Sequence, residues 1–262
     1  MSDRVLTERD GLQDGERADL NARQLAVYAR EFSEVYWAER RRTRELAAAL
    51  AREQDYQAQL QGAGAAVTRA DARVREATSG LITALAVALD QRDPYTEGHS
   101  QRVAAQAVWT GLELGLAVQQ LEVVAYAAKS HDLGKISMPD ELLRKPGRFT
   151  EDEWETMREH PQRGVEIMSV LAFTPAAVVE SIGQHHERLD GSGYPAGLRG
   201  DQICLGARII AVADSFDAIT TARAYRASLP HDQAFVELRA CSGHLLDGDV
   251  VAALERAWRQ HN

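Results

Sequence analysis

The sequence predicts an all-α protein, and two observations carry that prediction. No proline precedes Pro94, and the first 93 residues are poor in glycine and rich in Ala, Leu, Arg and Glu, a composition typical of long helices. Further along the chain, apolar residues recur at helical spacing, as at Leu121, Val124, Ala125 and Ala128. We therefore expect a helical arm over residues 1–76 and a compact helical domain over residues 77–262.

The arm is expected to contain a tail, a first helix and a break. Residues 1–18 are charged and are expected to be loose. Gly62 and Gly64 are expected to end the first helix, because glycine is unfavourable inside helices. A second helix, over residues 67–91, then enters the domain.

The first helix of the arm carries an incomplete heptad repeat. Charged residues at Glu39, Arg42 and Glu53 interrupt the apolar seam, so two interpretations remain open. One is a coiled coil, and the other is an amphipathic helix packed on its own domain. The two seam positions are occupied by Leu25, Phe32, Leu46 and Leu60, and by Tyr28, Val35, Ala49 and Tyr56.

Composition limits the class of protein. The hydrophobic fraction of 45% and the charged fraction of 26% are ordinary for a globular protein. A net charge of −9 argues against a general nucleic-acid binder. Cys204 and Cys241 are expected to be packed thiols in a reducing compartment. The N-terminus shows no secretory signal, and the apolar stretch near residues 81–89 is far too short for a membrane span, so we expect a cytoplasmic protein.

Polar side chains break the apolar helical faces at four places. The pair His131-Asp132 continues the stripe that ends at Ala128, and His160 lies among apolar neighbours. The pair His185-His186 ends another apolar stripe, and Asp214 lies mid-helix, where it cannot be an N-cap. Burying carboxylates without partners is costly, so each should have one. Imidazoles and carboxylates that point inward from several helices predict a metal site.

These residues also carry a family resemblance, over residues 77–262. The sequence resembles the HD-GYP group of HD-superfamily phosphohydrolases, which are all-helical, metal-dependent enzymes that hydrolyse cyclic di-GMP. The resemblance therefore implies an HD-type helical bundle with that activity. The matching motifs are His131-Asp132 with Gly134-Lys135, Glu159-His160-Pro161, residues 185–188 (His-His-Glu-Arg), residues 190–195 (Asp-Gly-Ser-Gly-Tyr-Pro), residues 214–218 and residues 98–103.

The resemblance implies a centre of two divalent metal ions, most suitably iron or manganese. Mixed imidazole and carboxylate ligands fit such ions. Asp132 is the candidate bridge, because a carboxylate offers two oxygens. Some relatives hold a third ion through a Glu at the position of Tyr95, a poor ligand, and Glu97 lies two residues away. We therefore expect two ions. The implied ligands are His99, His131 and Asp214 for one ion, and His160, His185 and His186 for the other.

Further residues are candidates for substrate binding and proton transfer. Lys135 is expected to hold a phosphate oxygen or to protonate the leaving 3′-oxygen, with Asp217 orienting it. The glycine-rich loop after His186 is interpreted as a substrate lip, in which backbone N–H groups and the Tyr194 ring face the ligand beside Gly193. The alternative interpretation is that this segment is an ordinary surface loop. Arg223 and Arg226 are interpreted as a phosphate clamp, or else as surface charge.

The expected function is a cyclic di-GMP phosphodiesterase that yields the linear dinucleotide or GMP. One alternative is an HD-type phosphohydrolase acting on another cyclic dinucleotide or nucleotide. Another is a non-catalytic cyclic di-GMP receptor that signals through the arm, although the intact ligand set and Lys135 argue against it. Expected partners are a second copy, joined through the N-terminal helices, and a regulatory or sensor protein.

Overall fold

The fold, obtained as a computed structural model, is described for residues 14–92, 98–171, 174–222 and 228–261. Within these ranges there is no β-strand, only two isolated bridges, so the all-α prediction is confirmed. No helix in these ranges combines the length and apolar character needed to cross a bilayer. The elements are α1 (Asp14–Arg92), α2 (His99–Glu113), α3 (Val118–Ser130), the 3₁₀ turn η2 (Leu133–Ser137), α4 (Asp140–Leu143), α5 (Glu151–Met157), α6 (His160–Ser169), α7 (Ala176–Gln184), the 3₁₀ turn η3 (Gly200–Gln202), α8 (Leu205–Thr220), α9 (His231–Cys241) and α10 (Gly248–His261).

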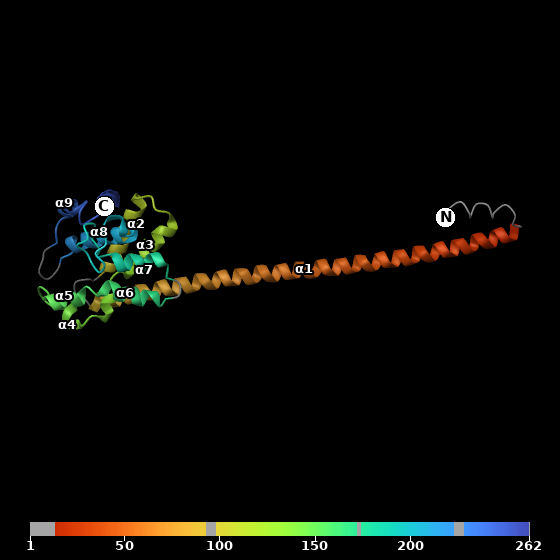
Figure 1. Cartoon of the computed structure of the whole chain (residues 1–262), viewed down its shortest axis with the longest axis horizontal. Helices are drawn as coiled ribbons and strands as arrows, with labels where there is room; N and C mark the ends of the chain where they lie inside the picture. Colours follow the sequence, from red (N-terminus) through yellow and green to blue (C-terminus); the bar gives the residue numbers. More distant parts are fainter. Residues whose placement is uncertain (1–13, 93–97, 172–173, 223–227, 262) are drawn as a thin grey trace. The chain divides into compact units, whose positions relative to one another are not determined.

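Helix α1 is uninterrupted over 79 residues (Figure 1). The predicted break at Gly62 and Gly64 is therefore wrong. Each glycine costs about 1 kcal/mol relative to alanine, and the alanines around them, the best helix formers, allow the helix to continue. The helix also begins at Asp14, so the end of the expected tail is helical, while residues 1–13 lie outside the described part of the chain.

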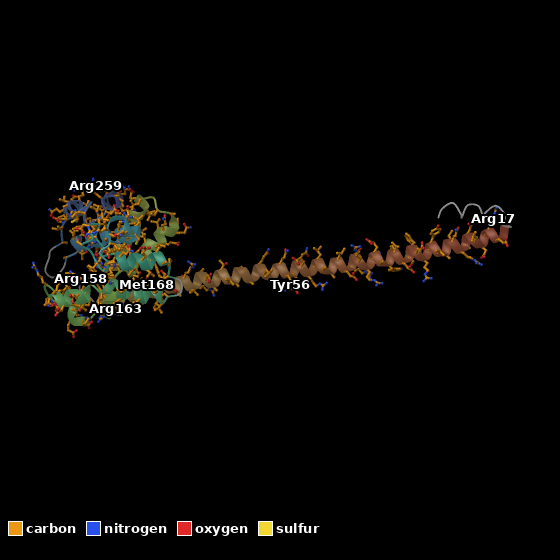
Figure 2. All side chains as sticks on the ribbon, in the orientation of Figure 1. Arg17, Tyr56, Arg158, Arg163, Met168 and Arg259 are labelled. Atoms are coloured by element: carbon orange, nitrogen blue, oxygen red, sulfur yellow. The ribbon has the colours of Figure 1, made fainter. Side chains whose placement is uncertain are left out.

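The chain divides into two compact units, residues 1–71 and 72–262, and α1 runs through the division. In the first unit the seam residues are solvent-exposed, with Leu25, Phe32 and Leu60 each more than 70% exposed. Figure 2 shows the side chains that project along this helix, Tyr56 among them. The first unit therefore presents an apolar seam that its own residues do not cover.

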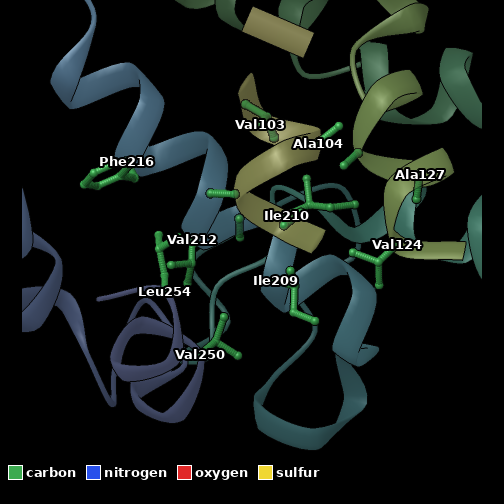
Figure 3. Packing of buried hydrophobic residues seen from close by; sticks show 14 of the residues in the cluster. Val103, Ala104, Val124, Ala127, Ile209, Ile210, Val212, Phe216, Val250 and Leu254 are labelled. Carbon is green, nitrogen blue, oxygen red and sulfur yellow. The ribbon is translucent and has the colours of Figure 1, made fainter. Parts of the chain in front are cut away.

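The second unit is built around α8. Its side chains are buried over almost every turn, including Ile209, Ile210, Val212 and Phe216. Figure 3 shows these residues together with apolar side chains of α2, α3 and α10. Each large aliphatic side chain buried in this way contributes about 1.5–3 kcal/mol. Burial on all sides fixes α8, and with it Asp214 and Asp217, relative to the neighbouring helices.

The last turn of α1 belongs to the second unit and is tied to both sides of the candidate site. Asp90 accepts a hydrogen bond of 3.0 Å from the hydroxyl of Ser100, which follows His99. Arg92 donates to the carbonyl oxygens of Ile136 (2.8 Å) and Met138 (2.9 Å). The segment that follows Asp132 and Lys135 is thus fastened to α1.

Candidate metal centre

The seven side chains predicted as metal ligands lie together in the second unit. They form two groups, and within each group the ligand atoms lie within 4.8 Å of one another. We call them the His99 cluster (His99, His131 and Asp214) and the His160 cluster (Asp132, His160, His185 and His186). The same division into two sets is implied by the sequence resemblance.

Three histidines are oriented by backbone carbonyls at helix ends. The Nδ1 atoms of His131, His160 and His185 lie 2.7, 2.8 and 2.6 Å from the carbonyl oxygens of the residues three positions earlier. A carbonyl can only accept, so each Nδ1 carries the proton and donates it. Their Nε2 atoms are left as lone-pair donors that face the interior.

The interior nitrogens have no adequate protein partner among the described residues. His131 Nε2 is buried without a hydrogen bond, and the Nε2 atoms of His160 and His185 face each other at 3.2 Å. With the proton on Nδ1, neither of these facing nitrogens can donate to the other. A buried unsatisfied nitrogen costs about 1–3 kcal/mol. Divalent cations, one in each cluster, would satisfy these nitrogens, so the donor set fits a metal centre.

His99 is held differently, by a carboxylate. It is the first residue of α2, and its Nδ1 lies 2.8 Å from Asp217 Oδ2. Asp217 also accepts two hydrogen bonds from Arg102, at 2.6 and 3.0 Å. Burial opposes ionisation, but hydrogen bonds from His99 and Arg102 lower the pKa of Asp217 below its usual value. Burial would likewise lower the pKa of His99, but Asp217 and the nearby carboxylates raise it above 6.5.

The expected role of Asp217 in orienting Lys135 is wrong. Among the described residues, no hydrogen bond or ion pair joins the two side chains, because the Asp217 carboxylate faces α2 and pairs with His99 and Arg102. Lys135 Nζ instead lies 2.6 Å from Asp132 Oδ2, three residues before it in the sequence. Asp217 thus positions a ligand of the His99 cluster, and Asp132 itself positions Lys135.

Asp132 belongs to the His160 cluster and also faces the His99 cluster. Its Oδ1 is 3.4 Å from His160 Nε2, while its Oδ2 is 3.5 Å from His131 Nε2 and 3.8 Å from His99 Nε2. The carboxylate is buried, which opposes ionisation, yet Lys135 and the surrounding histidines hold its pKa well below the usual value. Asp132 is therefore an anion with one oxygen toward each cluster.

The histidines of the His160 cluster are kept neutral by burial. Burial lowers the pKa of His160 to about 4 and the pKa values of His185 and His186 well below the usual value of 6.5. A neutral imidazole is the form that binds metal ions, so these ligands have no proton to lose near neutral pH.

A cleft of about 960 Å³ opens onto both clusters. This size matches that of small-molecule sites. Its walls combine acidic residues near the clusters with basic and aromatic residues elsewhere, which suits an anionic ligand that carries rings. The lining residues outside the metal clusters include Lys135, Lys145, Arg148, Phe149, Trp154, Arg188, Tyr194 and Ser215.

The loop after His186 only partly matches the predicted lip. Tyr194 does line the cleft, and its ring stacks on His186 with centroids 4.7 Å apart. The backbone N–H groups of Tyr194, Ala196 and Leu198, however, are engaged within the protein. Gly193 lies against backbone, and a side chain there would overlap residues 186–188. The expectation that loop N–H groups such as these face substrate is wrong, because internal acceptors bind them.

Glu187 is the residue that the sequence reasoning missed. It is 2% exposed, and its carboxylate accepts hydrogen bonds from the N–H groups of Ala196 (2.7 Å) and Leu198 (2.9 Å). It thereby fixes the loop that presses Tyr194 onto His186. Its position in the sequence could have indicated this role. It directly follows two candidate metal ligands, and a carboxylate that is buried there needs hydrogen-bond partners.

Four residues in the sequence predictions lie outside the described part of the chain. They are Arg223 and Arg226, interpreted as a phosphate clamp, and Tyr95 and Glu97, on which the expected number of metal ions depended.

Comparison with known proteins identifies the class. The HD domain family matches residues 83–250, and the chain belongs to that family. The chain is 41% identical over 189 residues to the cyclic di-GMP phosphodiesterase response regulator RpfG of Xanthomonas campestris pv. campestris, covering 71% of this chain and 50% of that protein. It is 39% identical to a cyclic di-GMP phosphodiesterase of Thermotoga maritima, covering 63% and 45% of the two chains. The resemblance seen in the sequence is thus confirmed.

Other similarities widen the range of relatives. The 3′3′-cGAMP-specific phosphodiesterase 3 of Vibrio cholerae is 37% identical, covering 68% of this chain and 38% of that protein. The chain thus spans about half the length, or less, of these curated relatives. Among solved structures, Bd1817, a HDG"Y"P protein from Bdellovibrio bacteriovorus, has a TM-score of 0.52 at 20% identity, over 62% of this chain and 51% of that one. That similarity supports the HD-type fold.

Proposed function

We propose that this protein hydrolyses a phosphodiester bond of cyclic di-GMP at a centre of two divalent metal ions. The observation that carries the proposal is the placement of Asp132, whose two oxygens face different histidine clusters. A bridging carboxylate fixes the separation of two ions, which is what a two-metal phosphodiesterase requires. The names of the relatives supply the substrate class.

The metal ions, when bound, supply a hydroxide at neutral pH and neutralise charge on the phosphate. The chain's own residues hold and orient the reactants. Lys135 is partly buried and cationic beside Asp132, so it can hold a phosphate oxygen or give a proton to the leaving 3′-oxygen. Basic residues that line the cleft, including Arg148 and Arg188, compensate the charge of a dinucleotide in a chain with net charge −9.

The metal is proposed to be iron or manganese. Five histidines and two carboxylates, with no thiolate, form a donor set of intermediate softness that suits these ions. The product is proposed to be the linear dinucleotide, GMP or both, since the same centre can cleave either bond.

A second candidate substrate is 3′3′-cGAMP, because relatives with similar identity are named phosphodiesterases specific for it. The two substrates share the same cyclic phosphodiester ring and differ in one base.

Turnover of purified, anaerobically metal-loaded protein tests the proposal. Cyclic di-GMP and 3′3′-cGAMP are each supplied, and products are separated by chromatography. We expect hydrolysis that a chelator abolishes and that added manganese or ferrous iron restores. Binding of cyclic di-GMP without any turnover in the loaded protein would instead favour the receptor alternative.

We also propose that the exposed seam of α1 pairs with the same seam of a second copy in a parallel coiled coil. Its apolar positions are exposed in the single chain, and burying such residues stabilises dimers. Light scattering on the full chain should give the mass of a dimer. The double variant Phe32→Glu, Leu46→Glu should be monomeric, whereas Ser33→Glu, Ala47→Glu, which adds the same charges off the seam, should remain dimeric. A monomeric wild-type chain would contradict the proposal.

A further inference from the structure

A series of flat side chains runs from the metal centre along the cleft. Tyr194 stacks on His186, with an angle of 27° between the rings. The guanidinium carbon of Arg158 then lies 5.9 Å from the Tyr194 ring centroid and 5.8 Å from that of Trp154. Phe149 packs edge-on against Trp154 with centroids 5.4 Å apart. The four rings all line the cleft, and Arg158 lies against two of them.

The outer part of this series is not required by the chemistry at the metal centre. Trp154 lies on α5 and is 40% exposed, and Arg158, labelled in Figure 2, follows at the C-cap of the same helix. Spaced four residues apart, they face the same side of α5. Exposed indole surface in a cleft is costly to leave in water and favours a ligand that can cover it.

Arg158 lies against two of the rings that line the cleft. Its guanidinium carbon is 5.8 Å from the ring centroid of Trp154 and 5.9 Å from that of Tyr194, so its positive charge is held beside the aromatic wall. Its ion pair with Glu151 is long, at 3.8 Å, between exposed side chains. Two parallel N–H groups of arginine match the O6 and N7 acceptors of guanine, whereas adenine presents a donor at the first of these positions.

We propose that Trp154, Arg158 and Tyr194 form a nucleobase subsite for one guanine of the dinucleotide. The base lies face-on to the aromatic wall, and its O6 and N7 accept hydrogen bonds from Arg158. Stacking on aromatic side chains accepts any base, so Arg158 supplies the preference for guanine. This inference rests on the proposed function and adds the residues that choose the base.

Steady-state kinetics with three substrates tests the subsite: cyclic di-GMP, cyclic di-AMP, and methyl p-nitrophenyl phosphate, a phosphodiester without a base. Arg158→Ala should raise KM for cyclic di-GMP about tenfold and reduce the preference over cyclic di-AMP. Arg158→Lys, which keeps the charge but not the paired N–H groups, should show the same loss of preference. Trp154→Ala should raise KM for both dinucleotides by about tenfold.

Methyl p-nitrophenyl phosphate reports on the metal centre alone and should be hydrolysed unchanged by all three variants. Arg163→Ala is the matched control, because Arg163 is an exposed arginine on α6 that pairs with Glu159 and Glu166, whereas Arg158 lies against two rings of the cleft wall. Unchanged KM for cyclic di-GMP in both Arg158→Ala and Trp154→Ala would overturn the subsite. Equal losses on the base-free substrate would also overturn it, since they would show a structural role.

Titration calorimetry of chelator-treated protein with cyclic di-GMP separates the subsite from catalysis. Binding that weakens about tenfold in Arg158→Ala supports the subsite even if the loaded enzyme proves inactive and the proposed reaction fails. Absence of binding to the wild-type chain in either form would overturn the subsite.

Discussion

The histidines that follow a helix end and the histidine that does not draw on such an end are held by different means. His131 and His185 cap the C-termini of α3 and α7, and His160, although it begins α6, lies three residues after the last residue of α5. The last carbonyls of a helix have no partner within it, so an imidazole at that point can donate to the carbonyl three residues earlier. His99 begins α2, and the acceptor for its Nδ1 is a side chain rather than a carbonyl of a preceding helix.

That acceptor is Asp217, and the difference has consequences for mutation. The carbonyls that orient His131, His160 and His185 belong to the backbone, so no single side-chain substitution removes them. The orientation of His99 depends on one carboxylate, itself held by Arg102. The His99 cluster is therefore the side of the centre that a substitution away from the ligands can weaken.

The largest expected effect comes from the residue shared by the two clusters. Asp132→Asn keeps the shape but removes the anion and one metal-binding oxygen. Loss of several kcal/mol of charge stabilisation should reduce kcat by about a thousandfold or more, with a fall in bound metal. Turnover and elemental analysis check this together. Near-normal activity with full metal content would exclude a bridging role.

A smaller effect, confined to metal binding by the His99 cluster, is expected from Asp217→Asn. Replacing a carboxylate that orients a metal-binding histidine typically costs about 10–100-fold in metal affinity or activity. The His99 cluster should lose its metal at lower chelator concentrations than the His160 cluster. The matched control is Asp201→Asn, because the Asp201 side chain is fully exposed. Equal loss from both clusters would contradict the proposed division.

The smallest expected effects are opposite pH dependences of stability in metal-free protein. The folded-state pKa of His99 is raised above 6.5, so its contribution is fully present below pH 6.5 and is lost as pH rises through the raised pKa. The folded-state pKa of His160 is lowered to about 4, so stability falls as pH drops from 6.5 toward 4. In denaturant unfolding with chelator present, His99→Gln should remove the first dependence, and His160→Gln should reduce the second, to which His185 and His186 also contribute. If the free energy of unfolding depended on pH in the same way in both variants, the assignment of opposite dependences to His99 and His160 would be contradicted.

The sequence was sufficient where a polar residue interrupted an apolar helical stripe. This pattern predicts His131, Asp132 and His160 in the interior, where the structure buries them, and the partly exposed Asp214 lies beside them. Thr150 and Glu153 form the capping box that opens α5, a local pattern of Thr followed three residues later by Glu. Such features depend on residues close in sequence, which is why they could be predicted.

The features of the site that the sequence did not predict depend on contacts between segments far apart in the chain. Helical spacing places Asp217 one turn after Asp214, but it does not show that the Asp217 carboxylate meets α2 at Arg102. The loop around Gly193 could be recognised from its glycines, yet the acceptor for its N–H groups, Glu187, could not be chosen by composition. Likewise, a pair of glycines suggested a helix break, but neighbouring alanines offset their local cost.

Anomalous scattering from crystals of the anaerobically purified, metal-loaded protein tests the two-metal centre most directly. The account predicts two peaks per chain. One should be bound by His99, His131 and Asp214 and the other by His160, His185 and His186, with ligand distances of about 2.0–2.3 Å and with Asp132 touching both. A single peak, two peaks that do not share Asp132, or a third well-occupied peak near Tyr95 or Glu97 would contradict it.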